Sequence, residues 1–326
     1  MTTSPPPAMP TRSLGRTGIQ VTPIGLGVMQ FSGSRLGFGV MFDELSTQQT
    51  DGIVQAALEE GINWFDTAEL YGFGRSERRL AAGLQTAGRK PGDVVVATKW
   101  FPLLRTAGNI PRTIRHRLRH LRGYPIDLYQ VHQPNGLSSP EAEMNAMADL
   151  VEAGKIRAVG VSNFDARRME RAHRALERRG LWLAANQVEY SLVERSIEPS
   201  GVLQAAKDLG VTVIAWSPTG RGLLTGKFHR DPSRLRRTPP ARRWMLRRHI
   251  EETRPLIEAL EAIGARYQAS AAQVALNWLI HFAGETVVAI PGASQADQAT
   301  DSARAMRFRI SEEELARLDE LTRAHR

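Results

Sequence analysis

Eight short apolar runs alternate with segments of helical spacing along the chain, and this alternation limits the folds that the chain can adopt. The runs are rich in β-branched residues, and residues 94–98 (Val-Val-Val-Ala-Thr) are apolar on both faces, as buried parallel strands are. Helical spacing lies between the runs, for example in residues 49–60, 76–85 and 166–178. The predicted strands are residues 24–29, 62–66, 94–99, 127–132, 156–161, 184–188, 212–216 and 286–290.

Eight strand–helix repeats predict an α/β fold, the (β/α)₈ TIM barrel, over residues 11–326 as a single domain. A doubly wound sheet is the alternative, and it usually shows a Gly-rich turn after its first strand. Here Gly25 and Gly27 lie within the first run, and no third glycine follows at the required spacing. The Pro- and Thr-rich residues 1–10 have no basic region followed by an apolar core. We therefore expect a disordered lead-in there and not a secretory signal.

Two long insertions and one extra helix interrupt the repeat. Residues 31–44 form a Gly-rich loop after the first predicted strand, and residues 219–250 form a basic loop after the seventh. Residues 251–267 predict an extra helix, and Ser311 with the three following Glu residues predicts a capping box for a final helix. Both loops follow strand ends at the C-terminal face, where barrels keep their active sites.

The basic charge of the chain is concentrated in one segment. The formal net charge is +9, and residues 221–250 hold ten Lys or Arg and a single acid, Asp231. A nucleic-acid-binding protein would place such charge on a recognisable module, so we expect no nucleic-acid partner. The alternatives for this segment are a binder of acidic surfaces and a solvated loop. Residues 112–122, also rich in Arg and His, predict a helix with a solvated face.

Several functional classes are excluded or disfavoured by composition. The chain has no cysteine, so disulfides, thiolate metal sites and cysteine nucleophiles are absent. No metal site is predicted. No apolar run approaches the roughly 18 residues that span a bilayer, so we expect a soluble, cytoplasmic protein without a membrane segment.

Four polar residues lie at the ends of three consecutive predicted strands. Asp66, Lys99 and His132 each close a strand, and Tyr71 follows Asp66 in the next loop. Taken singly, each has an ordinary structural explanation, such as a turn cap for the Asp or a surface position for the Lys. Neighbouring barrel strands are about 4.8 Å apart, however, so their C-terminal side chains converge. The sequence therefore predicts one polar cluster.

The residue types in this cluster suit proton transfer to an oxygen. An ordinary Tyr has a pKa near 10, and a Lys cation beside Tyr71 is expected to lower the pKa of its hydroxyl. Asp66 would hold Lys99 charged, and His132 would hydrogen-bond a carbonyl oxygen. This arrangement suits an oxygen that gains negative charge, as in carbonyl reduction. Acyl transfer is disfavoured because no activated Ser or Cys accompanies the cluster.

A series of longer motifs occurs in a familiar order. The chain resembles the aldo-keto reductase superfamily from residue 14 to the final predicted helix. The matching motifs are Leu14-Gly-Arg-Thr-Gly18, Phe65-Asp-Thr-Ala-Glu-Leu-Tyr-Gly72, Ala97-Thr-Lys99, Asp127-Leu-Tyr-Gln-Val-His132, Glu152-Ala-Gly-Lys-Ile-Arg157, Gly160-Val-Ser-Asn-Phe164, Asn186-Gln-Val-Glu-Tyr190, Ala215-Trp-Ser-Pro218 and Ile290-Pro-Gly-Ala293.

This resemblance implies an oxidoreductase that reduces aldehydes or ketones to alcohols with NADPH, NADH being possible. It implies that Tyr71 donates the proton, that Asp66 and Lys99 adjust the acidity of the Tyr71 hydroxyl, and that His132 orients the substrate carbonyl. The implied contacts to the nicotinamide are Ser162, Asn163, Gln187 and Trp216, to the pyrophosphate Ser217, Pro218, Gly222, Leu223 and Lys227, and to the adenosine end Gly292, Ser294 and Gln298. The implied substrate lining is Met29, Phe31, Trp100 and Phe101, with Trp244 from the basic loop and residues 33–39 as a lid.

The chain departs from the family pattern at the adenosine end. Relatives often carry Arg or Lys after the Ile-Pro-Gly-Ala motif, where this chain has Ser294 and Gln295. Cations of the basic loop, Lys227 among them, could reach phosphate oxygens in their place. The resemblance also leaves a second function open, a nicotinamide-binding regulatory subunit with weak turnover. The sequence gives no signal for oligomeric state.

Overall fold

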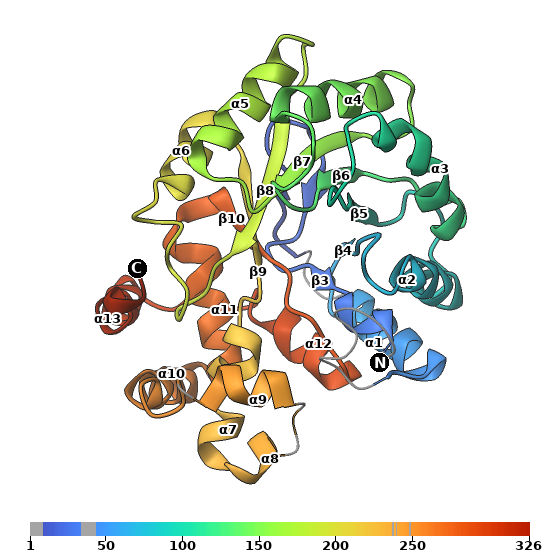
Figure 1. The fold of residues 1–326 in the computed structure, drawn as a ribbon. Helices are drawn as coiled ribbons and strands as arrows, with labels where there is room; N and C mark the ends of the chain where they lie inside the picture. The colour runs from blue at the N-terminus through green and yellow to red at the C-terminus, as the bar shows by residue number, and fades with distance from the viewer. Residues whose placement is uncertain (1–8, 34–43, 237, 239, 248) are drawn as a thin grey trace.

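The computed structural model describes residues 9–33, 44–236, 238, 240–247 and 249–326, and a parallel sheet lies at its centre (Figure 1). The sheet has eight strands, and their spatial order follows their order in the chain. Most of the predicted lead-in, most of the predicted lid, and Arg237 lie outside the described residues. The strands are β3 (Leu26–Gly27), β4 (Trp64–Asp66), β5 (Val95–Trp100), β6 (Leu128–Val131), β7 (Ala158–Ser162), β8 (Leu183–Glu189), β9 (Thr212–Trp216) and β10 (Val287–Ala289).

The first and last strands meet and close the sheet into a barrel. Ile24 pairs with Ala289 and Gly27 with Gly292, both in parallel orientation. The closure requires close approach, because a Cβ at Gly27 would lie 2.9 Å from the Ile290 carbonyl oxygen. These isolated bridges explain why β3 is shorter than the predicted strand. The predicted (β/α)₈ barrel is confirmed.

A helix follows each strand and packs on the outside of the barrel (Figure 1). Side-chain caps start several of these helices; Ser46, Ser139 and Asp165 each accept a hydrogen bond from a backbone N–H of the first turn. The outer helices are α1 (Thr47–Glu59), α2 (Arg75–Thr86), α3 (Asn109–His120), α4 (Pro140–Glu152), α5 (Ala166–Glu177), α6 (Val202–Leu209), α11 (Ala271–Phe282) and α12 (Ala296–Arg304). No helix of the described residues is long and apolar enough to cross a membrane.

A short antiparallel hairpin closes the N-terminal end of the barrel. Its strands are β1 (Arg12–Ser13) and β2 (Gln20–Val21), and Val21 with Leu14 and Ile19 of the connecting turn joins Trp64 in an apolar cluster. The Trp64 indole donates to the Thr22 carbonyl at 2.9 Å, which fixes the hairpin to β4. Two-residue strands show no periodicity, so the sequence did not predict this hairpin. The C-terminal end is left as the face that can carry a site.

The segment predicted as a long basic loop is instead folded into short helices. These are η3 (Gly220–Thr225), α7 (Lys227–Arg230), α8 (Ser233–Arg236) and α9 (Pro240–Arg247), which gather beside α10 (Arg254–Tyr267) in Figure 1. Their buried side chains, Leu223, Phe228, Leu235, Leu246 and Ile250, form a separate apolar cluster. The loop prediction was wrong because these few apolar residues are scattered among many Arg residues.

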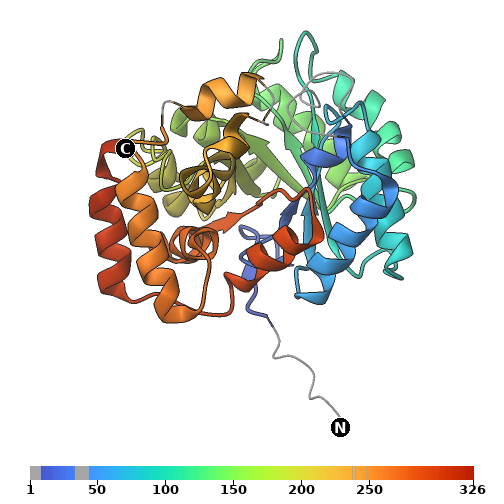
Figure 2. The same ribbon diagram turned by 90° about the horizontal axis from the view of Figure 1, so that it is seen from below.

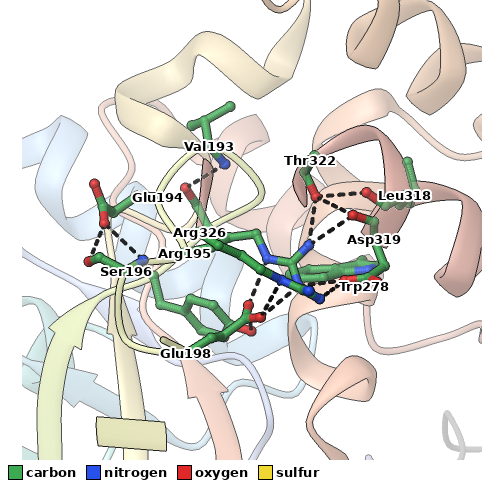
Figure 3. A network of polar contacts seen from close by, with 12 residues as sticks. Val193, Glu194, Arg195, Ser196, Glu198, Trp278, Leu318, Asp319, Thr322 and Arg326 are labelled. Atoms are coloured by element: carbon green, nitrogen blue, oxygen red, sulfur yellow. Dashed lines mark hydrogen bonds and ion pairs between the residues drawn. The ribbon is translucent and has the colours of Figure 1, made fainter. Parts of the chain in front are cut away.

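The final helix, α13 (Glu312–Leu321), begins at the predicted Ser311 capping box and lies beside α10 (Figure 2). A buried Arg195 joins its end to the loop after β8 (Figure 3). The Arg195 guanidinium donates to Glu198 at 2.6 Å, to Asp319 at 2.6 Å and to the Thr322 hydroxyl at 2.8 Å. Its Cζ also lies 4.9 Å from the ring centroid of Trp278. Arg326 pairs with the same two carboxylates, with Glu198 at 3.1 Å and with Asp319 at 2.6 Å, so the network contains two cations.

Replacing Arg195 with Met should lower the free energy of unfolding by about 2 kcal/mol, because Glu198 and Asp319 lose the hydrogen bonds of a buried cation and keep only those of the more exposed Arg326. Urea denaturation followed by circular dichroism measures this change. Arg323→Met is the matched control, because Arg323 lies in the turn after α13 and forms only a surface ion pair with Glu320 among the described residues. Equal unfolding free energies for the two variants would show that the network contributes nothing.

Candidate active site

The four polar residues predicted at strand ends lie on three neighbouring strands of the barrel. Asp66 ends β4, Lys99 is the penultimate residue of β5, and His132 directly follows β6. Tyr71 lies in the loop after β4, where its N–H donates to the Ala68 carbonyl in a tight turn. All four side chains are buried, and Lys99 has no exposed surface. The topology therefore brings the predicted cluster together.

Asp66 is held by three donors. The Lys99 ammonium contacts Asp66 Oδ1 and donates to the Thr67 carbonyl at 2.9 Å. The other oxygen, Oδ2, accepts from Gln187 Nε2 at 2.9 Å and from Gln130 Nε2 at 3.1 Å. Buried charges need such partners, because an unpaired carboxylate in a dry interior is strongly destabilising. Asp66 thus fixes the position of the Lys99 cation.

Tyr71 lies next to this ion pair. Lys99 Nζ is 5.1 Å from the centroid of the Tyr71 ring. Burial raises the pKa of Tyr71, and the Lys99 cation offsets part of that rise. The sequence predicted a net lowering of this pKa. Desolvation of the Tyr71 hydroxyl raises the pKa by more than the Lys99 cation lowers it, so that prediction was wrong. Tyr71 is therefore held as the protonated phenol at neutral pH.

His132 faces Tyr71 as a neutral ring. The two ring centroids are 5.6 Å apart at an interplanar angle of 84°. Burial lowers the pKa of His132 to about 3, with a further contribution from the Lys99 charge. Among the described residues, His132 Nδ1 is buried and has no hydrogen-bond partner. An uncharged imidazole beside a phenol can hydrogen-bond a substrate oxygen without competing for its proton.

A chain of hydrogen bonds joins the residues expected at the nicotinamide. The Trp216 indole donates to Asn163 Oδ1 at 3.1 Å, and Asn163 Nδ2 donates to the Ser162 hydroxyl at 3.0 Å. Ser162 in turn donates to the Gln187 carbonyl at 2.8 Å. The Trp216 ring is partly exposed, and Asn163 has a left-handed φ of 60°. The structure brings these residues together, but the Gln187 side chain points to Asp66.

The stretch expected at the pyrophosphate has an unusual backbone. Ser217 and the three residues 220–222 have left-handed φ angles, a conformation that strains any residue except glycine. An ion pair of 2.8 Å between Arg221 and Glu189 holds this turn against the end of β8. Pro218 lies within the stretch, Gly222 and Leu223 are buried, and Lys227 begins α7. Successive left-handed residues turn backbone N–H groups toward one side, as in anion-binding loops.

The residues expected at the adenosine end lie at the start of α12. Gln298 Oε1 accepts from the Ser294 N–H at 2.9 Å and from the Ser294 hydroxyl at 3.2 Å. The Gln30 amide packs against Gly292, in the space that a Cβ would occupy, so these two loops meet here. Gln30 Oε1 is buried without a hydrogen-bond partner among the described residues. The unfilled Gln30 acceptor and the partly exposed Trp216 fit a bound dinucleotide.

The predicted substrate residues divide into two groups. Met29 and Phe101 are partly buried, and the Phe101 ring lies edge-on to His132 with centroids 6.0 Å apart. Phe31 and Trp100 have no exposed surface, and both belong to the core between strands and helices. The Trp100 indole is also occupied, because it donates to Asn109 at 2.9 Å. The structure therefore does not bring Phe31 and Trp100 to the site.

Comparison with known proteins agrees with this geometry. The family model described as aldo/keto reductase family matches residues 23–323. The chain belongs to the aldo/keto reductase family. Aldo/keto reductases are oxidoreductases that use nicotinamide cofactors, so the chain is an enzyme of that class.

Similar proteins cover nearly the whole reductase chain. An uncharacterized oxidoreductase of Mycobacterium tuberculosis is 38% identical over 309 residues, which cover 94% of this chain and 91% of the relative. A chloroplastic pyridoxal reductase of Arabidopsis thaliana is 31% identical over 314 residues, covering 92% and 83%. The solved structure of a glycerol dehydrogenase from Gluconobacter oxydans superposes with a TM-score of 0.79 at 28% identity, covering 97% of this chain and 95% of that one.

The reductase site also contains residues that the sequence argument did not single out. Gln130 of β6 donates to Asp66 of β4 across the intervening strand β5. Glu69 accepts from the Phe101 N–H at 3.2 Å and from Arg105 at 2.9 Å, which ties the Tyr71 loop to the Phe101 loop. Gln130 was identifiable as a polar residue inside an apolar strand. Glu69 gave no comparable signal, because a loop carboxylate usually faces solvent.

Proposed function

We propose that this reductase converts aldehydes or ketones to alcohols with NADPH and that Tyr71 donates the proton. The observation that carries the proposal is the buried group of a phenol, an ammonium and a carboxylate beside a neutral imidazole. The raised pKa of Tyr71 and the lowered pKa of His132 keep the phenol protonated and the imidazole neutral, as the reaction needs. Loss of reduced-nicotinamide absorbance with a panel of aldehydes and ketones tests the activity directly.

In this mechanism the chain supplies the proton and the electrostatics. The bound nicotinamide supplies the hydride that the carbonyl carbon receives. His132 hydrogen-bonds the carbonyl oxygen and holds it next to the Tyr71 hydroxyl. Tyr71 then gives its proton to that oxygen, which becomes the alcohol hydroxyl. Lys99 stabilises the phenolate left on Tyr71, and Asp66 keeps Lys99 charged and in place.

The chain's own residues would hold the dinucleotide along the C-terminal face. Ser162 and Asn163 offer the donors and acceptors that match a carboxamide, and Trp216 offers a flat apolar ring. Ser217, Pro218, Gly222, Leu223 and Lys227 would lie along the pyrophosphate, and Gly292, Ser294 and Gln298 would contact the adenosine. Gln187 would act through its hydrogen bond to Asp66. Met29 and Phe101 would contact the substrate.

NADPH should bind about tenfold or more tightly than NADH, because a charge-assisted contact to its extra phosphate is worth at least that factor. Titration of tryptophan fluorescence measures both affinities, since Trp216 would lie against the nicotinamide. Lys227→Met should narrow the ratio if the Lys227 ammonium reaches the extra phosphate of NADPH, whereas a contact to the pyrophosphate, which both dinucleotides share, would leave the ratio unchanged. Lys155→Met is the matched control, because Lys155 lies between α4 and β7 at the opposite end of the barrel. Equal wild-type affinities would contradict the NADPH preference.

A further inference from the structure

Large apolar side chains are exposed on the three loops that follow β4, β5 and β6. In the described part of the chain, Phe73 is 66% exposed, Leu103 48%, Leu104 78% and Leu137 65%. Single exposed apolar residues are common on protein surfaces and need no explanation. Four on three consecutive loops at one end of the barrel form a set that does need one. We call these four residues the apolar rim.

Two loops of the apolar rim carry a residue of the catalytic cluster, and the third carries Phe101, which lies beside His132. Phe73 is two residues after Tyr71, and Leu137 is five residues after His132. Leu103 is two residues after Phe101, whose ring lies edge-on to His132. The rim therefore continues outward from the residues that would surround the carbonyl group.

The three loops are fastened to one another. Glu69 of the first loop pairs with Arg105 of the second at 2.9 Å. The Arg105 carbonyl accepts from the Leu137 N–H of the third loop at 2.9 Å, and the Ala107 N–H donates to the Ser138 hydroxyl at 2.9 Å. These contacts place the rim residues on adjoining segments. The loops that carry the rim residues are therefore joined to one another beside the catalytic cluster.

The backbone conformation of the rim is a second, independent observation. Phe73 has a φ of 50° and Leu104 a φ of 57°, the left-handed region that favours glycine. Phe73 lies between Gly72 and Gly74. A glycine at position 73 would adopt this φ without strain, but the chain has a large apolar residue there. Strained non-glycine residues of this kind gather at sites that bind ligands. Both strained positions carry a side chain that projects into solvent.

We propose that the apolar rim binds the hydrocarbon tail of an aldehyde or ketone substrate whose carbonyl group reaches Tyr71 and His132. The proposal rests on the proposed reductase function and names its substrate class: carbonyl compounds with an extended apolar chain. Continuity with the catalytic loops identifies the occupant. Arg105, the cation within the rim loops, is paired with Glu69, which makes it a poor ligand for anionic lipid headgroups.

The experiment compares straight-chain aldehydes from butanal to decanal. For the wild type, kcat/KM should rise about twofold for each added methylene, since one side of the tail is removed from water. The double variant Phe73→Ser/Leu104→Ser should lower the ratio of kcat/KM for decanal to that for butanal by at least about tenfold. Trp182→Ser/Leu321→Ser is the control, because these exposed apolar residues lie away from the catalytic loops, and it should keep the wild-type ratio.

Calorimetric titration with decanoate and butyrate separates this proposal from the proposed function. If decanoate binds more tightly than butyrate and the rim variant abolishes this preference, the rim proposal is supported, whether or not any aldehyde is reduced. If the wild type reduces no aldehyde, only the reductase proposal is overturned. Reduction of butanal and decanal at equal kcat/KM by the wild type would overturn the rim proposal alone. An equal loss for both aldehydes in the rim variant would also overturn it, since this indicates a structural role. Sedimentation of the protein with phosphatidylcholine vesicles tests a membrane as the occupant. If the rim variant abolishes this sedimentation but keeps the wild-type ratio of kcat/KM for decanal to that for butanal, the rim binds a membrane and not the substrate tail.

Discussion

Replacing Tyr71 with Phe should lower kcat for carbonyl reduction by about a thousandfold and leave the affinity for NADPH within about twofold, because a positioned general acid contributes a factor of this size. The variant removes one oxygen atom and keeps the ring against His132 and Lys99. The hydride would still reach the carbonyl carbon, but the oxygen would receive its proton from water. Steady-state kinetics and a tryptophan fluorescence titration measure the two quantities on the same preparation.

Tyr124→Phe is the control for this experiment. Tyr124 is also buried, but its hydroxyl donates to the Arg89 carbonyl outside the catalytic cluster. We expect full activity from this variant. A Tyr71→Phe enzyme that keeps more than a tenth of the wild-type kcat would overturn the assignment of the proton donor. A wild type that binds NADPH tightly and turns over none of the carbonyl compounds would favour a regulatory subunit.

Most of the site residues that could be predicted from the sequence lie at the C-terminal ends of strands. Asp66, Lys99 and His132 could be placed together because parallel strands in a barrel deliver their last residues to one face. Asp165 and Ser311 could be placed at helix starts because an N-cap depends on local chemistry alone. These predictions require only the order of the strands and the type of each residue.

The features that the sequence could not predict depend on packing in three dimensions. The net direction of the Tyr71 pKa depends on how completely burial removes water from the hydroxyl, which no spacing reveals. Phe31 and Trp100 were expected in the pocket, but their side chains point into the core. Gln187 was expected at the nicotinamide, but an amide can turn toward either of two partners, and here it binds Asp66. For Phe31, Trp100 and Gln187 the sequence allows two directions for the side chain, and packing decides between them.

Replacing Lys99 with Met should lower both stability and activity, and a second substitution should separate the two effects. The variant leaves the Asp66 carboxylate buried with only two amide donors, which should cost about 3–5 kcal/mol of unfolding free energy. It also removes the cation that stabilises the Tyr71 phenolate, so kcat should fall by about a thousandfold. Urea denaturation and steady-state kinetics measure the two losses.

The stability loss should depend on pH in a defined direction. Burial by itself lowers the pKa of Lys99, but attraction to Asp66 and Tyr71 outweighs it, and the net pKa is raised above its ordinary 10.5. A raised pKa in the folded state means that the cation stabilises the fold fully below pH 10.5. That contribution disappears as the pH rises through the folded-state value. The difference between wild type and Lys99→Met should therefore be constant near neutral pH and shrink in strong alkali.

The double variant Asp66→Asn/Lys99→Met distinguishes a positioning role from a purely structural one. It removes both buried charges, so no carboxylate is left without a cation, and most of the lost stability should return. The activity should not return, because Tyr71 still lacks the cation that stabilises its phenolate. Lys207→Met is the control for loss of a lysine, since Lys207 lies on the exposed face of α6. Recovery of kcat in the double variant would mean that Lys99 serves only to neutralise Asp66, and that proton transfer from Tyr71 needs no cation beside it.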